Sequence, residues 1–332
     1  MIKKLLLSAL LLCPLALSAA DFPLGIYCIK NVKDLEIVKK AGFDTIQTYN
    51  QKPQDLAALA QEAQKQGLKV VFYPNKIEGD LIEKARTWPV AAWYIYDEPG
   101  VHHIRYKVLK DMDNSANAKF PQAKTAFVVG KGSNIRAYAD ISDILMVDWY
   151  PVPHLDLTSL GQQIKDAKYY LAKNKVPDKP VWAVIQAFDW RNFKQYRPDD
   201  QRIGRFPTAD EMRFMAYHAI TEGAEGIFFF HYQNPQQHKE EWNTISKVSK
   251  ELAKIKPVFE QGSAADIPFA LPSNFNAKAW LYKGYYYYLI VNTSANQAQL
   301  PQELNKKAYK AVTGKKTTQA EPYGIYIFKK KA

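Results

Sequence analysis

Two adjacent carboxylates, Asp97 and Glu98, follow an apolar and aromatic run of β-forming residues at positions 90–96. Pro99 and Gly100 come directly after the acids. Because proline cannot donate to a sheet and glycine relaxes the backbone, we expect a strand to end where the acids begin. Acids at a buried strand end can exchange protons with a ligand, or they can simply cap the next helix. The neighbouring strands must decide between these two interpretations.

Short β-forming runs alternate with helical runs over most of the chain. We expect strands at residues 22–28, 43–49, 69–73, 90–97, 125–129, 143–150, 180–188 and 226–232. We expect helices at residues 32–41, 54–66, 80–87, 102–114, 134–139, 157–174, 208–222 and 240–255, the last one closed by Pro257. Thr208 and Glu211 have the spacing of a capping box at a helix start. Eight strand–helix units predict an α/β fold of the (β/α)₈ TIM-barrel type.

A doubly wound open sheet is the competing fold. It is disfavoured because Tyr27-Cys28-Ile29 stands where a glycine-rich phosphate loop would follow the first strand. After Gly262 the helical pattern stops, and residues 278–292 and 324–329 resemble strands. We therefore expect a barrel at residues 21–262 and a small antiparallel β-domain at residues 263–332.

The first twenty residues have the pattern of a secretory signal peptide. Lys3 and Lys4 precede an apolar run at residues 5–17, and small residues at 18–20 offer a cleavage site. The alternative is an uncleaved anchor, although the run is short for a bilayer span. We expect a periplasmic or secreted protein with no transmembrane segment after cleavage. Cys28 is then the only cysteine, which excludes an internal disulfide.

The formal net charge is +12. Lysines occur along the whole chain, from Lys30 and Lys33 to the run at residues 329–331. Dispersed lysines are typical of a solvated surface, and export argues against a nucleic-acid partner. An acidic or envelope polysaccharide is the partner that this charge favours.

The ends of the eight expected strands should meet at one cleft. Aromatic rings there can stack on the C–H faces of sugars, while amides and acids bind hydroxyl groups. The alternative is that these aromatic residues only pack at the barrel rim. The predicted substrate-binding residues are Tyr27, Tyr49, Asn50, Tyr73, Asn75, Tyr96, Trp149, Tyr150, Gln186, Trp190, His231 and Tyr232.

Glycosidic cleavage needs one carboxylic acid and a second group that attacks or stabilises the sugar carbon. Glu98 is the predicted general acid, because burial and the adjacent Asp97 should both raise its pKa. Asp97 would tune or orient that acid, and Asp148 is the best second carboxylate. No cofactor motif is present, and His102 and His103 at a helix start are typical of solvated residues rather than metal ligands. The absence of a Gly-x-Ser-x-Gly elbow disfavours an esterase.

The sequence Trp-Tyr-x-Tyr-Asp-Glu-Pro at residues 93–99, with Asp-x-Tyr-Pro at residues 148–151, resembles the (β/α)₈ glycoside hydrolases of the large retaining superfamily. The resemblance implies that Glu98 is the acid/base, although Asp97 stands where the family has Asn. It also places Gln186 where the family has its nucleophilic Glu, and an amide cannot form the glycosyl-enzyme ester.

Three explanations of Gln186 remain open. The adjacent Asp97 and Glu98 also resemble the pair in hexosaminidase-type barrels, which implies that Glu98 is the acid/base and that Asp97 orients a substrate N-acetyl group that acts as nucleophile. Alternatively, Asp148 could be the base of an inverting reaction if it lies about 6.5–9.5 Å from Glu98. The third explanation is a protein that binds saccharide without cleaving it.

Overall fold

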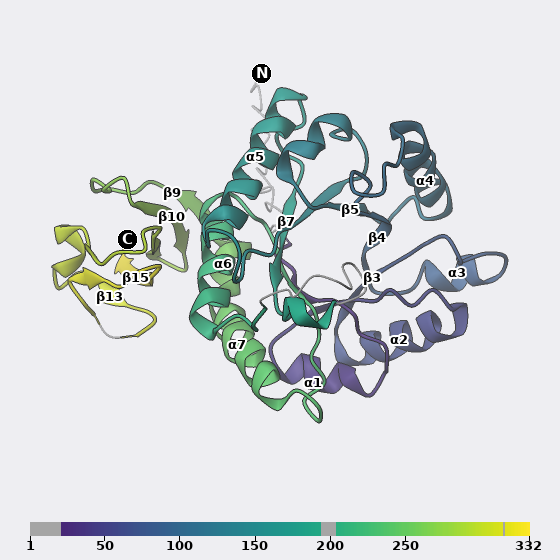
Figure 1. Ribbon diagram of the computed structural model, residues 1–332, viewed down its shortest axis with the longest axis horizontal. Coiled ribbons are helices and arrows are strands. Elements are labelled where there is room, and N and C mark those ends of the chain that lie inside the picture. The colour runs from purple at the N-terminus through teal and green to yellow at the C-terminus, as the bar shows by residue number, and fades with distance from the viewer. Residues whose placement is uncertain (1–20, 194–203, 315) are drawn as a thin grey trace, which may run out of the picture.

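A computed structural model describes residues 21–193, 204–314 and 316–332; the predicted signal peptide lies outside the described residues. Eight parallel strands form a closed barrel, in which each strand pairs with the next and β8 pairs with β1 (Figure 1). The strands are β1 Leu24–Ile26, β2 Thr45–Gln47, β3 Lys69–Phe72, β4 Val90–Asp97, β5 Thr125–Val129, β6 Ile144–Asp148, β7 Val181–Gln186 and β8 Ile227–Phe230. The predicted (β/α)₈ barrel is confirmed.

Helices cover the outside of this barrel (Figure 1). They are α1 Asp34–Lys40, α2 Pro53–Gln66, α3 Leu81–Ala85, α4 Tyr106–Lys119, α5 Ser159–Lys173, α6 Ala209–Thr221 and α7 Lys239–Gln261, with the 3₁₀ helices η1 Gly132–Ala137 and η2 Trp190–Asn192. The capping box predicted at Thr208 and Glu211 is present at the start of α6. None of the helices in the described part of the chain is long and apolar enough to span a bilayer.

Helices α4 and α7 differ most from the prediction, and α4 ends at Lys119 rather than at residue 114. Helix α4 begins at Tyr106 rather than at residue 102, because the amides of Val101 and His102 bond to the carbonyl of Glu98 in a turn. Helix α7 continues through Pro257 to Gln261. Proline removes one helical hydrogen bond, but Phe259 beyond it is buried against Phe22, with ring centroids 5.2 Å apart, and this packing holds the last turn.

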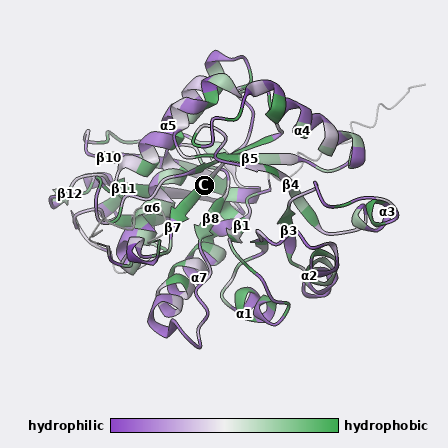
Figure 2. Cartoon of the chain, turned by 45° about the vertical axis from the view of Figure 1, so that its right-hand side comes forward, coloured by the Kyte–Doolittle hydropathy of each residue, from purple (hydrophilic) through white to green (hydrophobic). Residues whose placement is uncertain are grey.

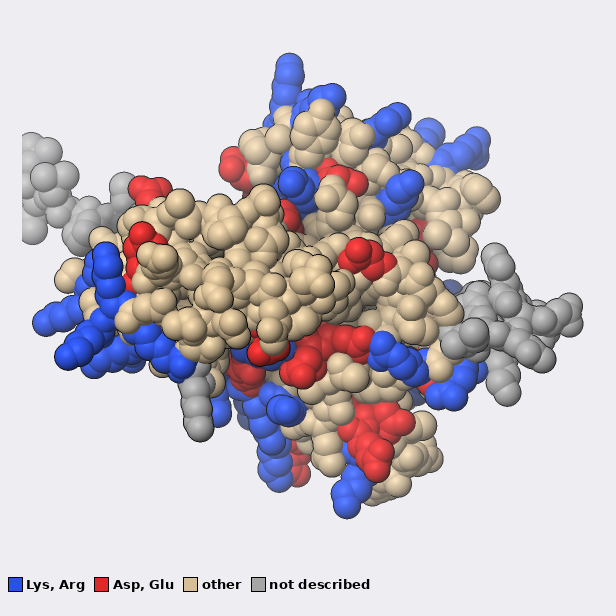
Figure 3. Space-filling model, turned by 60° about the vertical axis from the view of Figure 1, so that its left-hand side comes forward, with Lys and Arg blue, Asp and Glu red and all other residues tan. Residues whose placement is uncertain are grey.

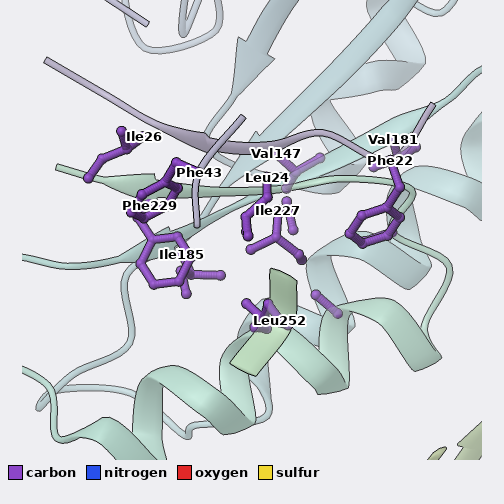
Figure 4. Packing of buried hydrophobic residues seen from close by; sticks show 14 of the residues in the cluster. Phe22, Leu24, Ile26, Phe43, Val147, Val181, Ile185, Ile227, Phe229 and Leu252 are labelled. Carbon is purple, nitrogen blue, oxygen red and sulfur yellow. The ribbon is translucent and has the colours of Figure 1, made fainter. Parts of the chain in front are cut away.

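Alternation along the strands divides the core into two layers. Inward-facing residues fill the barrel itself; they are Tyr27, Val71, Tyr73, Ala92, Tyr94, Ala126, Val128, Ile144, Met146, Trp182, Val184 and Phe228. Outward-facing residues such as Leu24, Ile185 and Phe229 pack against the helices, including Leu252 of α7 (Figure 4). Figure 2 shows apolar strands at the centre of the molecule and mixed colours along the helices. The filled interior leaves only the strand ends to form a site.

The C-terminal residues form the expected antiparallel β-domain. Its strands are β9 Ser263–Ala265, β10 Phe275–Tyr282, β11 Tyr285–Asn292, β12 Ala298–Gln299, β13 Lys310–Ala311, β14 Gln319–Ala320 and β15 Ile325–Lys331, with η4 at Gln302–Asn305. The main sheet has the order β13-β15-β11-β10-β9. The run predicted as one strand at 278–292 is a hairpin, because Lys283 and Gly284 both have positive φ. One face of the sheet packs on α6 and α7, where Trp280 meets Phe259.

Candidate active site

A β-bulge in β4 turns Asp97 toward the barrel mouth. Tyr94 pairs with Ala126 and Tyr96 pairs with Phe127, so Ile95 is an extra residue without its own partner. In a regular strand Tyr94 and Asp97 would face opposite sides, and the bulge puts them on the same side. The Tyr94 hydroxyl donates a hydrogen bond to Asp97 Oδ1 at 3.0 Å.

Glu98 reaches the same site through an unusual backbone conformation. Its φ is 45°, in the left-handed region that few non-glycine residues adopt. Its side chain lies against Gly130 at the end of β5, where a Cβ atom would stand 2.1 Å from Glu98 Oε1. Left-handed backbone at a cluster of acids is a feature of functional sites. Gly130 is the residue that leaves room for the Glu98 carboxylate.

Asp148 at the end of β6 lies on the other side of this gap. The same Cβ position on Gly130 would be 3.8 Å from Asp148 Oδ1, so this oxygen and Glu98 Oε1 are separated by at most the sum of the two distances. That limit applies to one oxygen of each acid, whereas the roughly 6.5–9.5 Å of inverting glycosidases separates whole carboxyl groups. The spacing therefore brings Asp148 and Glu98 to one site and leaves the inverting arrangement open.

The three acids change one another's ionisation. Burial and the charge of Asp97 raise the pKa of Glu98 to about 7. Burial also raises the pKa of Asp97, with hydrogen bonds from Tyr49 and Tyr94 opposing it. The pKa of Asp148 lies well above its usual range because of burial and its acidic neighbours Glu98 and Asp97. Because the pKa values of its acids are raised in this way, the site retains bound protons at neutral pH.

Asp148 and Glu98 differ in their access to solvent. Asp148 is 8% exposed; its Oδ2 accepts a hydrogen bond from the Tyr150 hydroxyl, and its Oδ1 is buried without a partner among the described residues. Glu98 is only partly buried. A ligand at the mouth therefore meets Glu98 more readily than Asp148.

The Asp97→Asn variant tests the coupling of Asp97 to Glu98. Glu98 must be protonated to act as an acid, so activity should fall as the pH rises through its pKa of about 7. Removing the Asp97 charge lowers that pKa, while desolvation of Glu98 persists. We expect the alkaline limb of the pH profile of kcat/KM to move down by roughly one pH unit. The exposed control Asp80→Asn should keep the alkaline limb at the wild-type pH. An alkaline limb at that same pH in Asp97→Asn would contradict the coupling.

Aromatic rings form a wall beside the acids. The rings of Tyr27 and Tyr49 lie 6.1 Å apart, Tyr49 and Tyr73 6.3 Å, and Tyr73 and Tyr94 5.1 Å. Tyr49 is 37% exposed and therefore presents part of its ring to a ligand. On the β8 side, Phe230 stacks on Tyr150 at 5.5 Å and contacts Tyr27 at 5.6 Å.

Two cavities flank the segment that carries the acids. One of about 610 Å³ lies between the ends of β3 and β4 and helix α4, and Tyr73, Asn75, Tyr96, Asp97 and His102 contribute to its wall. The other, of about 510 Å³, lies by Gly100 and η1. Neither is lined by Glu98 or Asp148, so the larger cavity extends the site outward from Asp97. The described residues contain no group of three or more His, Cys, Asp and Glu side chains suited to a metal ion.

Several residues predicted to bind substrate have other partners. The Asn50 amide donates to Asp55 at 2.8 Å, the Trp149 indole donates to Ser159 at 3.0 Å, and the Tyr232 hydroxyl donates to Asp34 at 2.9 Å. Trp149 and Tyr232 contribute to the outer core between strands and helices. Trp190 and His231 both contact the ring of Phe188 near Tyr150. The structure thus brings together Tyr27, Tyr49, Tyr73, Tyr150 and the three acids.

Gln186 has a backbone-binding role. Its side chain is fully buried; Oε1 accepts from the Val152 amide, and Nε2 donates to the carbonyls of Val152 and Phe188. Both amide protons and one acceptor position of the oxygen are used by the loops after β6 and β7, and the buried side chain has no free proton for a sugar. This explains why an amide suits the position.

The Gln186→Glu variant, which restores the acid of the resembling family, is expected to lose stability. A carboxylate cannot donate to the two carbonyls, which leaves both unsatisfied in a buried site. We expect the free energy of unfolding to fall by about 3 kcal/mol in denaturant titration. The exposed control Gln54→Glu should change it by less than about 0.5 kcal/mol. A Gln186→Glu protein as stable as wild type would show that these hydrogen bonds are dispensable.

Three residues of the site were not among the predicted catalytic and binding residues. Tyr94 binds Asp97, Gly130 makes room for Glu98, and Phe230 stacks on Tyr150. Inward alternation in β4 was a signal for Tyr94. The roles of Gly130 and Phe230 depend on contacts between different strands, and no local signal indicates them.

Known proteins resemble this chain in structure only. No protein-family model and no curated protein sequence matches it. The GH30 endoxylanase of Clostridium papyrosolvens superposes with a TM-score of 0.55 at 12% identity, over 95% of this chain and 98% of that one. The α-amylase of Geobacillus thermoleovorans, solved with acarbose, superposes with a TM-score of 0.56 at 10% identity, over 93% and 98%. This chain has the fold of glycoside hydrolases.

An α-amylase from Anoxybacillus is also similar, with a TM-score of 0.54 at 12% identity, over 90% of this chain and 89% of that one. The neighbours are an endoxylanase and α-amylases by name, so the shared barrel does not specify a substrate. At such identities the shared fold does not specify the reaction, which depends on the acids of the site.

Proposed function

We propose that this protein is an exported glycoside hydrolase in which Glu98 is the general acid. The observation that carries the proposal is the placement of Glu98: partly exposed at the barrel mouth, packed against Gly130, and with a pKa raised to about 7 by burial and Asp97. An acid with this pKa is substantially protonated at neutral pH and can give its proton to a leaving glycosidic oxygen.

Asp148 is the second carboxylate of the proposed mechanism. Its Oδ1 and Glu98 Oε1 lie near the same point beside Gly130, so the two acids can act on one glycosidic bond. Asp148 is itself largely buried, whereas Asp97 borders the larger cavity. A substrate acetamido group oriented by Asp97 could therefore supply the nucleophile. Asp148 would then help to keep Glu98 protonated. The alternative is direct attack by Asp148.

The substrate of this proposal is a poly- or oligosaccharide. Tyr49 and Tyr73 offer ring surface beside the acids, and Asn75 and Tyr96 offer polar groups in the larger cavity. Export follows from the leader at residues 1–20, and it makes envelope and extracellular glycans the accessible substrates. The net positive charge favours acidic members of this class.

Product release from a panel of envelope, exopolysaccharide and plant glycans tests the function. The panel should contain N-acetylated sugars and their deacetylated counterparts, and the anomeric form of the first product should be followed by NMR. Cleavage is expected. Retained configuration with a requirement for the acetyl group would identify substrate-assisted attack, retained configuration without that requirement would identify direct attack by Asp148, and inverted configuration would identify Asp148 as the base. Glycan binding without any product release would instead indicate a saccharide-binding protein.

A further inference from the structure

Most of the net charge of this chain belongs to its C-terminal domain. Residues 263–332 contain ten lysines, no arginine and three acidic residues, a net charge of +7 out of +12. Lysines occur along the whole chain, but the excess of positive over negative charge is greatest in this domain. Figure 3, turned so that the left-hand side of Figure 1 comes forward, shows basic side chains gathered at its left edge.

Strand pairing places three of these lysines on one face of the sheet. Lys310 of β13 lies directly opposite Lys329 of β15, and residues directly opposite each other in antiparallel strands point to the same face. Lys331 is two positions further along β15 and shares that face. We call Lys310, Lys329 and Lys331 the lysine row. Lys310 and Lys331 are exposed, and Lys329 is partly exposed.

Tyrosine rings continue the lysine row on the neighbouring strand. Tyr287 lies opposite Lys329 and Tyr285 lies opposite Lys331. The Lys329 ammonium stands 5.3 Å from the centre of the Tyr285 ring, and Tyr285 is 38% exposed. Contact with the ring holds the lysine stem in place, which reduces the entropy lost when its ammonium group binds an anion.

The row has no internal counter-charge. None of its lysines forms an ion pair with a carboxylate of the described residues, whereas other lysines, such as Lys168 and Lys256, do form such pairs. Like charges directly opposite each other on a sheet are unfavourable. Keeping Lys310 opposite Lys329 costs stability, and an external anion would relieve that cost.

We propose that the lysine row and Tyr285 bind an acidic polysaccharide, separately from the barrel mouth. The row of cations matches a chain of regularly spaced carboxylate or sulfate groups, and the exposed tyrosine ring matches the C–H face of a sugar. This inference rests on the proposed glycoside hydrolase function, since the domain would hold the substrate polymer near the cleft. The saccharide is preferred to a lipid surface because the row lies on a sheet beside a ring, without an apolar helix face to insert.

The test compares two triple variants of the mature chain, each carrying Glu98→Gln so that bound polymer is not cleaved. One is Lys310→Gln, Lys329→Gln and Lys331→Gln. The matched control is Lys33→Gln, Lys52→Gln and Lys84→Gln, which removes three exposed lysines from the α1, α2 and α3 side of the barrel, across the molecule in Figure 1. Binding to polygalacturonate, heparin and neutral dextran is measured by affinity electrophoresis at low and high salt.

The row variant should bind polygalacturonate or heparin about tenfold more weakly than its parent, and the control should change by less than about twofold. Binding should weaken with salt and be absent for dextran. Equal loss in both triple variants, or none in the row variant, would overturn the proposal. Stronger binding to anionic lipid vesicles or single-stranded DNA than to either polymer would also overturn it.

Two further measurements keep the result interpretable. Lys331→Glu changes one exposed residue near the chain end, so it should weaken binding even if the triple variant folds poorly. Lys310→Gln should raise the melting temperature slightly by removing the like-charge pair, and a clear decrease would contradict that argument. Cleavage is measured separately with Glu98 intact, so loss of polymer binding and absence of hydrolase activity are distinguishable.

Discussion

Replacement of Glu98 by Gln is expected to lower kcat/KM for glycan cleavage about 10³-fold while leaving glycan binding intact. Gln has nearly the same shape but no proton to give to the leaving oxygen. The side chain keeps its place against Gly130, so the loss reflects chemistry rather than displacement. The measurement is initial rates of product release, with binding followed separately by calorimetry.

The same variant should gain stability in a defined pH range. The pKa of Glu98 rises from 4.5 to about 7 on folding, so the folded state binds more protons than the unfolded state between these values. Stability therefore falls as the pH rises from about 4.5 to about 7, and the full loss is present above that range. Glu98→Gln should match wild type near pH 4 and exceed it in free energy of unfolding above pH 7.

Glu78→Gln is the matched control, because Glu78 is an exposed acid in the loop after β3. It should leave both cleavage and the pH dependence of stability unchanged. If Glu98→Gln cleaves glycans at the wild-type rate, Glu98 is not the acid. If it lacks the stability gain above pH 7, the raised pKa is wrong even where the activity is lost.

A methyl group at Gly130 should inactivate the site with every acid still present. In Gly130→Ala the new Cβ would lie 2.1 Å from Glu98 Oε1, so the carboxylate must move by more than an ångström. Displacement of a catalytic group by this amount costs about 10²-fold or more in rate. We expect kcat to fall by at least that factor and the free energy of unfolding by about 1–3 kcal/mol from overpacking.

Gly100→Ala is the control for this prediction. Gly100 adjoins the same acids, but its Cβ would meet only the flexible end of Asn134 at 2.9 Å. Its kcat should stay within about threefold of wild type, since Asn134 can rotate away. Wild-type rates in Gly130→Ala would mean that Glu98 does not act from the position seen here.

The barrel, the small β-domain and the acids at the end of β4 were predictable from sequence. Three local patterns place the elements along the chain: the alternation of apolar residues in strands, their spacing in helices, and the end of a strand at Pro99-Gly100. The sequence also places Asp97, Glu98 and Asp148 at strand ends, which meet at one mouth in a parallel barrel.

Which side chains face that mouth was decided only by the tertiary structure. Trp149 and Tyr232 stand at strand ends like Tyr49 and Tyr73, yet they pack outward against the helices. Gln186 stands where the resembling family has its nucleophile, yet its amide group is hydrogen-bonded to the backbone of Val152 and Phe188. A residue type at a strand end says nothing about orientation, because one shift in parity moves a side chain to the opposite face.

The sequence by itself therefore determined the barrel architecture and the position of the acid pair at the end of β4, since short-range sequence patterns indicate both. Tertiary structure decided that both acids of that pair face the site, through the bulge at Ile95 and the left-handed Glu98. It also decided that lysines distant in sequence form one row, through the pairing of β13 with β15. Both results depend on pairing between segments far apart in the chain, which local propensity does not encode.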